Sequence, residues 1–392
     1  MLLIYKICRL SIISVVLLLW GTISVQASFQ QLQTQEIKNP EWGIWQDADA
    51  PPVQFEIVQT FGAEDKSIHE ILPMLHLFIR GLFSDDSGNI YFLNVKSEKV
   101  ISFGPDGQLR WAVGRKGRGP GDFLTPRDIA WDQKEYLYVL DKGNTRIDQY
   151  DMNGNYLSSY ILPDVGPFFP ENLFYIAPNK FFISSPVTKE YAARTIIAEI
   201  NNDNLNTYSA LHIQDHPHIQ LPLGHYRMPD HNVIDQQVYV GSKNGYYFYS
   251  YDLLGRSQKK ISRNYNADIT LGIFNKKNRS SIVDIYGGTS APIPFSDDYY
   301  LQQTYWPKNV EDPQQHLKKI FNNSATPVEY ERSLDLLNSN FELLYSIHST
   351  GSYHKDAGKI LTADKQGHIY SYFPEPYPYL KKIKVTIIPP KP

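Results

Sequence analysis

Short runs of apolar and aromatic residues alternate with polar turns along most of this chain, and the alternation repeats. The segment 88–94 recurs as 135–141, and the segment 101–107 recurs as 148–154. The step from Tyr91 to Tyr138 and the step from Gly107 to Gly154 are both 47 residues. A fixed period of about 40–50 residues with several strands in each period is typical of a β-propeller.

Six such units can be aligned on the central strand of each. The aligned residues are Tyr91, Tyr138, Phe182, Tyr239, Tyr300 and Tyr370. Within a unit, Asp-Gly or Asn-Gly pairs such as Asp106-Gly107 supply the positive φ angles that tight hairpins need. The pattern therefore predicts an all-β fold: a six-bladed β-propeller of four-stranded antiparallel blades.

A ring of blades must also close. A strand-like segment, Val53–Phe61, precedes the first full unit, and another, Leu380–Ile388, lies at the far end of the chain. We expect the early segment to complete the last blade, because this arrangement leaves no free sheet edge.

The N-terminal region has a different composition. Lys6 and Arg9 precede an apolar run over Leu10–Trp20, and Val25-Gln26-Ala27 offers small residues for cleavage. This pattern predicts a signal peptide over residues 1–27, and the alternative is an uncleaved anchor. The run is short for a membrane span, so we expect no stable span after cleavage.

The remainder divides into two parts. Residues 28–50 form a polar lead-in, and residues 51–390 form the propeller. An insertion at about 306–331 enlarges the fifth unit, with a short helix expected over Val310–Phe321.

Composition narrows the function classes. The 392 residues carry 38 Lys and Arg against 41 Asp and Glu, so no basic excess points to nucleic acid. Cys8 is the single cysteine and lies in the predicted signal peptide, so the mature protein has no disulfide. Its stability must therefore come from packing.

One stretch resembles a known family. Residues 114–123 form a Gly-rich loop with Gly119-Pro120-Gly121, and Thr125-Pro126-Arg127-Asp128 follows it. With the strand around Tyr138, this stretch resembles an NHL repeat. The whole chain resembles exported bacterial six-bladed β-propeller proteins with NHL-like repeats. That resemblance implies a location in the periplasm, at the cell surface or outside the cell.

The resemblance also implies where a site lies. In NHL-like propellers the residue after the proline lies near the central channel, and related peptide-amidating lyases have a zinc-binding His there. This chain has Arg127 at that position and Arg80 one repeat earlier. Two arginines at the channel mouth favour an anionic ligand. The alternative is that each pairs with a carboxylate, such as Asp128 or Glu171, and holds the blades together.

Further candidates follow from the same offsets. We expect Glu171, Asp230 and His231 to join Arg80 and Arg127 at the channel mouth. Arg115 and Arg118 of the Gly-rich loop are expected at its rim. That loop lacks the Gly-Lys-Ser/Thr ending of a phosphate-binding loop, so the alternative is a purely structural turn.

A histidine-rich segment is the candidate for a metal site. His212, His216, His218, His225 and His231 lie within 20 residues, with Asp215 and Asp230 nearby. Nothing in the irregular, proline-containing segment fixes a tetrahedral geometry. We therefore expect no cofactor, with zinc or calcium as the alternative.

These observations favour a monomeric, non-enzymatic binding module whose ligand is a protein, a peptide or a glycan on one face of the ring. The alternative is a metal-dependent hydrolase or lyase with its site in the channel. Its candidate residues are Glu171, Asn172, Asp230, His231 and His354.

Overall fold

A computed structural model describes most of the chain. The described residues are 34–62, 79–164, 169–185, 194–212, 231–242, 245–254, 256–264, 271–276, 279–284, 287–308, 315, 319, 329–350, 355–375 and 378–391. The chain divides into residues 1–35 and residues 36–392. The architecture below is that of the second part.

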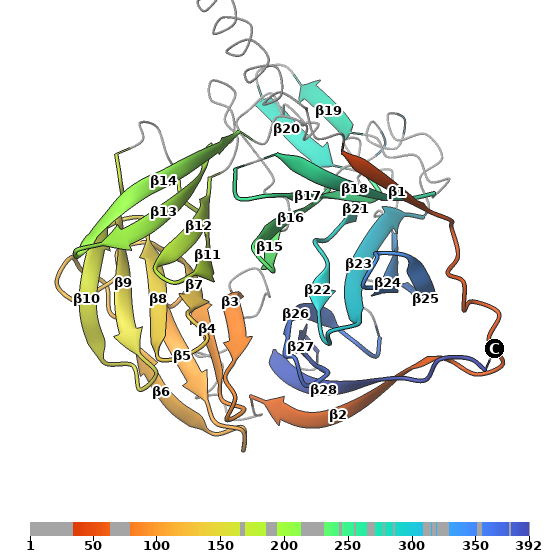
Figure 1. The fold of residues 1–392 in the computed structure, drawn as a ribbon, viewed down its shortest axis with the longest axis horizontal. Coiled ribbons are helices and arrows are strands. Elements are labelled where there is room, and N and C mark those ends of the chain that lie inside the picture. The colour runs from red at the N-terminus through yellow and green to blue at the C-terminus, as the bar shows by residue number, and fades with distance from the viewer. Residues whose placement is uncertain are drawn as a thin grey trace, which may run out of the picture. The chain divides into compact units, whose positions relative to one another are not determined.

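Six antiparallel sheets follow one another around a ring (Figure 1). The strands of each blade are given from the inside outwards. Blade 1 has β3 (Ile79–Ser84), β4 (Ile90–Asn94), β5 (Lys99–Phe103) and β6 (Leu109–Val113), and blade 2 has β7 (Pro126–Trp131), β8 (Tyr136–Asp141), β9 (Arg146–Asp151) and β10 (Tyr156–Ile161). Blade 3 has β11 (Asn172–Ala177), β12 (Lys180–Ser184), β13 (Arg194–Asn201) and β14 (Asn204–His212). Blade 4 has β15 (His231–Ile234), β16 (Gln237–Gly241), β17 (Tyr247–Tyr251) and β18 (Ser257–Arg263); blade 5 has β21 (Gly288–Thr289) and β22 (Ile293–Pro294), then β23 (Tyr299–Pro307), β24 (Tyr330–Asn338) and β25 (Leu343–Thr350); blade 6 has β26 (Lys359–Ala363), β27 (His368–Phe373), β28 (Tyr379–Ile387) and β2 (Val53–Phe61).

The second strand of each blade is buried on both faces, because a blade packs against two neighbours. In β4, Ile90 and Phe92 pack towards blade 6, whereas Tyr91 and Leu93 pack towards blade 2. Successive side chains of a strand point to opposite faces, so a continuous apolar run supplies both interfaces. The buried residues form six clusters, one at each junction between blades.

The predicted six-bladed propeller is confirmed, and all six aligned residues lie on second strands. The alignment is one residue out of register in blade 5. Tyr300 packs towards the preceding blade, blade 4, whereas Leu301 packs towards the following blade, blade 6. In the other five blades the aligned residue packs towards the following blade, so Leu301 is the true equivalent. A slip of one residue reverses the face of every side chain in a strand, and the Tyr299-Tyr300 pair hides the correct phase.

The predicted closure is also confirmed. β2 pairs with β28 from Val53 opposite Ile387 to Phe61 opposite Leu380, so the outermost strand of blade 6 comes from near the N-terminus. Phe61 is fully buried in the cluster between blades 6 and 1, while Ile57 on the same strand is 55% exposed.

The segment before β2 does more than lead in to the ring. β1 (Gln35–Asn39) is the outermost strand of blade 4. The backbone of Ile44 and Trp45 then donates to the carbonyls of Leu343 and Leu344 in blade 5. Residues 36–61 therefore bind the outer edges of blades 4, 5 and 6 in succession, and we call this segment the strap.

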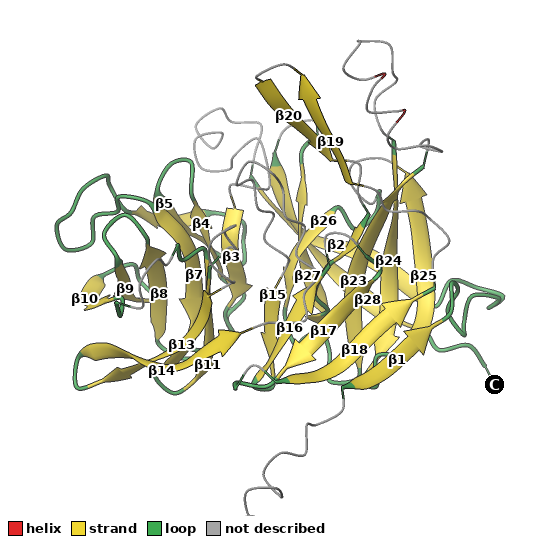
Figure 2. Ribbon diagram, turned by 90° about the horizontal axis from the view of Figure 1, so that it is seen from above, coloured by secondary structure: helices red, strands yellow, loops and turns green. Residues whose placement is uncertain are grey.

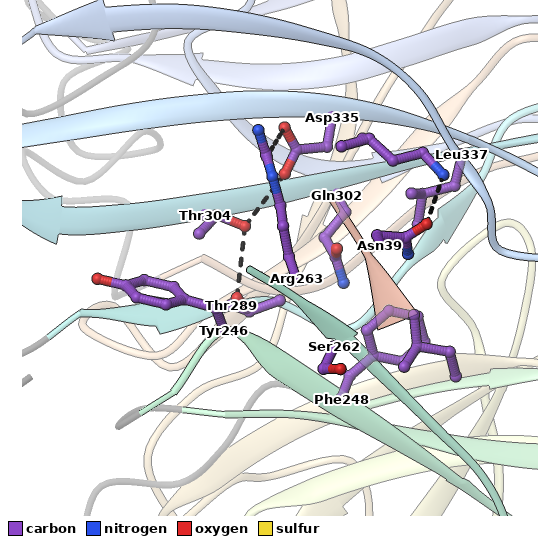
Figure 3. A pocket seen from close by; sticks show the side chains of 12 residues that line it. Asn39, Tyr246, Phe248, Ser262, Arg263, Thr289, Gln302, Thr304, Asp335 and Leu337 are labelled. Carbon is purple, nitrogen blue, oxygen red and sulfur yellow. Dashed lines mark hydrogen bonds and ion pairs between the residues drawn. The ribbon is translucent and has the colours of Figure 1, made fainter. Parts of the chain in front are cut away.

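The strap, blade 4 and blade 5 share a buried ion pair. Arg263 Nη1 donates to Asp335 Oδ1 at 2.5 Å, and both side chains are almost fully buried. Figure 3 shows the pair among the side chains that line a small pocket. Its cavity of about 10 Å³ is close to the smallest space that holds one water molecule. The other donors of Arg263 reach the Glu41 carbonyl and Ser346 Oγ. This cavity is part of a blade junction and has no room for a larger ligand.

Two features lie outside this scheme. The hairpin of β19 (Leu271–Lys276) and β20 (Arg279–Asp284) pairs only with itself and lies apart from the blades (Figure 2). The predicted signal peptide lies outside the described residues, and so does almost all of the predicted helix over Val310–Phe321. Within the described part of the chain, no helix is long and apolar enough to cross a membrane.

We predict that Arg263→Met lowers the free energy of unfolding by about 3–5 kcal/mol, because it leaves the Asp335 carboxylate buried and unpaired. The matched control is Arg256→Met, which removes an exposed partner of Asp252 and should cost at most about 1 kcal/mol. Urea unfolding monitored by tryptophan fluorescence measures both. An equal loss of unfolding free energy in the two variants would show that the buried pair has no special role.

We also predict that closure depends on one side chain of β2. Phe61→Ala should destabilise the ring by about 3–5 kcal/mol, because it leaves a cavity between blades 6 and 1. Ile57→Ala, on the same strand but exposed, should change the stability by less than about 1 kcal/mol. Calorimetric melting tests this prediction, and a parent-like melting temperature for Phe61→Ala would contradict it.

Candidate functional site

The two ends of the ring axis are built differently. At one end, which we call the turn end, the first two strands of a blade are joined by a tight turn. The carboxylates of Asp85, Asp132 and Asp364 each accept hydrogen bonds from backbone N–H groups two and four residues later. Acidic residues at this end therefore have a structural role, because they fix the turns.

The other end, where the inner strands begin, is the channel mouth. Ile79 of β3 lies opposite Asn94, and Pro126 of β7 lies opposite Asp141, so these residues mark the mouth end of blades 1 and 2. The long connections between the described strands leave from this end, among them 62–78, 185–193, 213–230 and 308–329. Long connections at one end of a rigid scaffold are where binding residues concentrate.

Three successive inner strands carry a basic residue beside a β-bulge at the mouth. The pairing is irregular between Arg80 and Phe83 in β3, between Pro126 and Asp128 in β7, and between Ile360 and Thr362 in β26. The basic residues are Arg80, Arg127 and Lys359, in blades 1, 2 and 6. A bulge re-aims the side chains around it and is common next to binding sites. We call these three residues the cationic arc.

Arg127 is held by a carboxylate of the next blade. Its Nε lies 3.5 Å from Glu171 Oε2, and Lys142 Nζ donates to Glu171 Oε1 at 2.8 Å. Glu171 directly precedes β11, so this triad links blades 2 and 3 at the mouth. One carboxylate faces two cations, which leaves a local excess of positive charge.

The guanidinium groups of Arg80 and Arg127 have unused donors. Among the described residues, neither side chain donates a hydrogen bond, and the buried Arg127 Nε faces Glu171 Oε2 in an ion pair of 3.5 Å. Arg80 is exposed and acts on Asp128 only through its charge. A guanidinium is a planar fork of five donors that matches a carboxylate or a phosphate. The exposed Arg80 and the partly exposed Arg127 can therefore still meet an anion.

Asp128 lies beneath the arc and joins three inner strands. Its Oδ2 accepts from Leu173 N of blade 3 at 2.8 Å, and its Oδ1 accepts from Ile129 N. A Cβ on Gly81 of blade 1 would lie 2.8 Å from Asp128 Oδ1, so β3 approaches closely only because residue 81 is glycine with a φ of +58°. Burial raises the pKa of this carboxyl to about 7, against the lowering effect of the Leu173 hydrogen bond and the Arg80 charge.

The Gly-rich loop is braced from below. Arg146 donates to the carbonyls of Gly119 and Asp122, at 2.8 and 2.9 Å, and Asn144 donates to the Gly117 carbonyl at 3.0 Å. Arg115 forms an ion pair with Asp122, whereas the Arg118 side chain is exposed. The loop is therefore a fixed structure that presents basic side chains at its surface.

The remaining candidates are less informative. Asn172 donates to Ser184 Oγ, and the ring of His231 lies 5.9 Å from that of Phe182. Asp230, His354 and most of the histidine-rich segment lie outside the described residues. Within the described part, no three His, Cys, Asp or Glu side chains are grouped as metal ligands.

Lys359 and Lys142 were not among the predicted site residues. The step from Tyr91 to Tyr370, applied to Arg80, leads to Lys359, so the repeat contained this signal. Lys142 follows the last residue of β8, and only the fold shows that this turn lies beside Glu171.

Comparisons with known proteins support this architecture. Residues 82–185 match the family DUF5128, described as a 6-bladed beta-propeller. NHL repeat-containing protein 3 from Homo sapiens is 27% identical over 109 residues, which is 27% of this chain and 31% of the human protein. The mouse protein of the same name is 25% identical over the same length. The match thus spans about a third of the length of these relatives.

Two solved structures share the fold. A DUF4221 family member from Bacteroides vulgatus has a TM-score of 0.53 and 11% identity, over 86% of this chain and 99% of that one. A Bacteroides fragilis protein described as exported has a TM-score of 0.54 and 9% identity, over 90% of this chain and all of that one. At these identities the likeness concerns the fold alone. The chain is a six-bladed β-propeller, and over about a quarter of its length it is similar to NHL repeat-containing proteins.

We predict a pH dependence of stability that comes from Asp128. Its pKa is about 7 in the folded protein and near 4 in the unfolded chain, so the folded state binds the proton more tightly. The contribution of Asp128 is therefore largest below pH 4 and falls by about 1.4 kcal/mol per unit as the pH rises towards 7. The difference in unfolding free energy between the parent and Asp128→Asn should follow this slope.

Carbon NMR of the Asp128 carboxyl provides the direct measurement. Arg80→Gln should raise its pKa, because it removes a favourable charge, and Glu171→Gln should lower it. A carboxyl that titrates near pH 4 would contradict the prediction.

Proposed function

We propose that this protein is an exported, monomeric binding module without enzymatic activity, which captures a protein, peptide or glycan at the channel mouth. The ligand presents an anionic group to Arg80 and Arg127. Lys359 and Lys142 add to the positive charge, and Glu171 and His231 complete the surroundings. Arg115 and Arg118 of the Gly-rich loop lie at the rim.

The observation that carries this proposal is a pair of arginines at the mouth, the exposed Arg80 and the partly exposed Arg127. Arg80 and Arg127 lie on adjacent inner strands that contact each other, at matching positions of the repeat and beside a bulge in each strand. Neither side chain donates a hydrogen bond to a described residue, although Arg127 faces Glu171 at 3.5 Å. Arginines with a structural role behave differently here, because Arg146 and Arg263 donate to several acceptors.

The carboxylates at the mouth support a binding role rather than a catalytic one. Asp128 is buried, and both of its oxygens accept backbone hydrogen bonds. Glu171 faces Arg127 and Lys142. Each carboxylate therefore joins blades, and neither faces an open position as a general base would.

Two observations support export. Residues 1–27 have the basic, apolar and small-residue order of a signal peptide. The Bacteroides fragilis protein of similar fold is described as exported.

We predict that citrate, a small tricarboxylate, binds at the mouth. Arg80→Ala/Arg127→Ala should weaken binding by at least about tenfold, because each fork supplies a charge-assisted pair worth roughly 1.5–3 kcal/mol. Isothermal titration calorimetry measures the affinity. Lys134→Ala, at the turn end, is the matched control and should bind as the parent does. Equal affinity of the parent and the double variant would refute the proposed function.

A further inference from the structure

We infer that the mouth site continues outwards as a basic track across blade 2, and that this track binds an extended acidic peptide segment. The inference rests on the proposed function and adds the length and the chemical class of the ligand. The track consists of Lys116, Arg118, Lys142, Arg127 and Arg80.

The outer end of the track is the Gly-rich loop. Lys116 and Arg118 are exposed, and neither side chain has a hydrogen bond or ion pair with a described residue. The backbone beneath them is fixed, because Arg146 donates to the carbonyl of Arg118 and Asn144 donates to that of Gly117. A rigid backbone holds these charges in place, which lowers the entropic cost of binding a partner.

The turn after β8 makes the track continuous. Asn144 contacts the Gly-rich loop, whereas Lys142, two residues earlier, reaches Glu171 and so lies beside Arg127. Lys142 N also donates to the Thr125 carbonyl, immediately before β7. Basic side chains therefore extend from the rim of blade 2 to the inner strands.

The charge of the two ends supports a binding role for these residues. The protein as a whole has a net charge of −3, and the turn end of blades 1 and 2 carries Asp85, Asp106, Asp132 and Asp151. Those carboxylates are needed, because each accepts backbone hydrogen bonds in its own turn. The lysines and arginines of the track have no comparable structural task, apart from the ion pairs with Glu171.

An acidic peptide fits this track better than a small anion or a nucleic acid. A small anion needs a few convergent cations, whereas the basic side chains of the track are spread over a loop, a turn and two inner strands. Single-stranded nucleic acids need aromatic surfaces on which bases stack. Among the described residues, Phe169 is a half-exposed aromatic residue beside the track, and Lys142 Nζ already lies over its ring, at 5.4 Å from the ring centre. Arginine forks match side-chain carboxylates, and clusters of arginine recognise acidic motifs in proteins.

The test uses the full-length mature protein and a fluorescent oligoglutamate peptide, with binding followed by anisotropy. The parent should bind, and raised salt should weaken the complex. Two double variants should each weaken binding by about tenfold: Lys116→Ala/Arg118→Ala and Arg80→Ala/Arg127→Ala. Each of them removes two ion pairs between the protein and the peptide. The control is Lys134→Ala/Lys365→Ala at the turn end, which should bind as the parent does. Melting curves check that all variants are folded; Lys116 and Arg118 are exposed, so their replacement leaves the fold intact.

Each outcome has a distinct meaning. If only Arg80→Ala/Arg127→Ala weakens binding, the extended track is refuted while the proposed function stands. If neither pair matters, both proposals fail. If an oligothymidylate or a sulfated oligosaccharide binds more tightly than oligoglutamate, the peptide class is wrong. If the control weakens binding equally, the interaction is non-specific, and the track is again refuted.

Discussion

The fold depends on the burial of both faces of every blade. A four-stranded sheet with one exposed apolar face would be unstable, and in this chain each sheet covers its neighbours on both sides. Six separate apolar clusters result, one at each junction, and none is the centre of the molecule. Stability is therefore distributed around the ring, and the junction between the last and first blades must be as well packed as the others.

The strap helps to hold this junction and the neighbouring blades together. By pairing with the outer edges of blades 4, 5 and 6, it joins the start of the described chain to its end. A Cβ on Gly43 would lie 2.3 Å from the Leu344 carbonyl, so the close approach of the strap to blade 5 requires glycine at that position. The buried pair of Arg263 and Asp335 then connects the strap to blades 4 and 5 by hydrogen bonds as well as by packing.

The charged side chains at the two ends of the ring also differ in their surroundings. Aspartates at the turn end cap backbone turns, so their charge follows from the way the hairpins are built. At the mouth, bulges in three successive inner strands accompany Arg80, Arg127 and Lys359. Asp128 below them connects blades 1, 2 and 3. Binding at the mouth would therefore act on the residues that hold these blades together.

The sequence alone determined the class of fold, the number of blades and the strand that closes the ring, because short apolar runs, Asp-Gly turns and a repeated offset can be read directly along the chain. It also pointed to Arg80 and Arg127, and the same offset leads to Lys359. It could not give the phase of blade 5, where two adjacent tyrosines satisfy the pattern equally well. Only the tertiary structure placed Lys142 beside Glu171, Leu173 over Asp128 and the strap across three blades. These contacts join residues that are distant along the chain, and their geometry depends on how whole sheets pack.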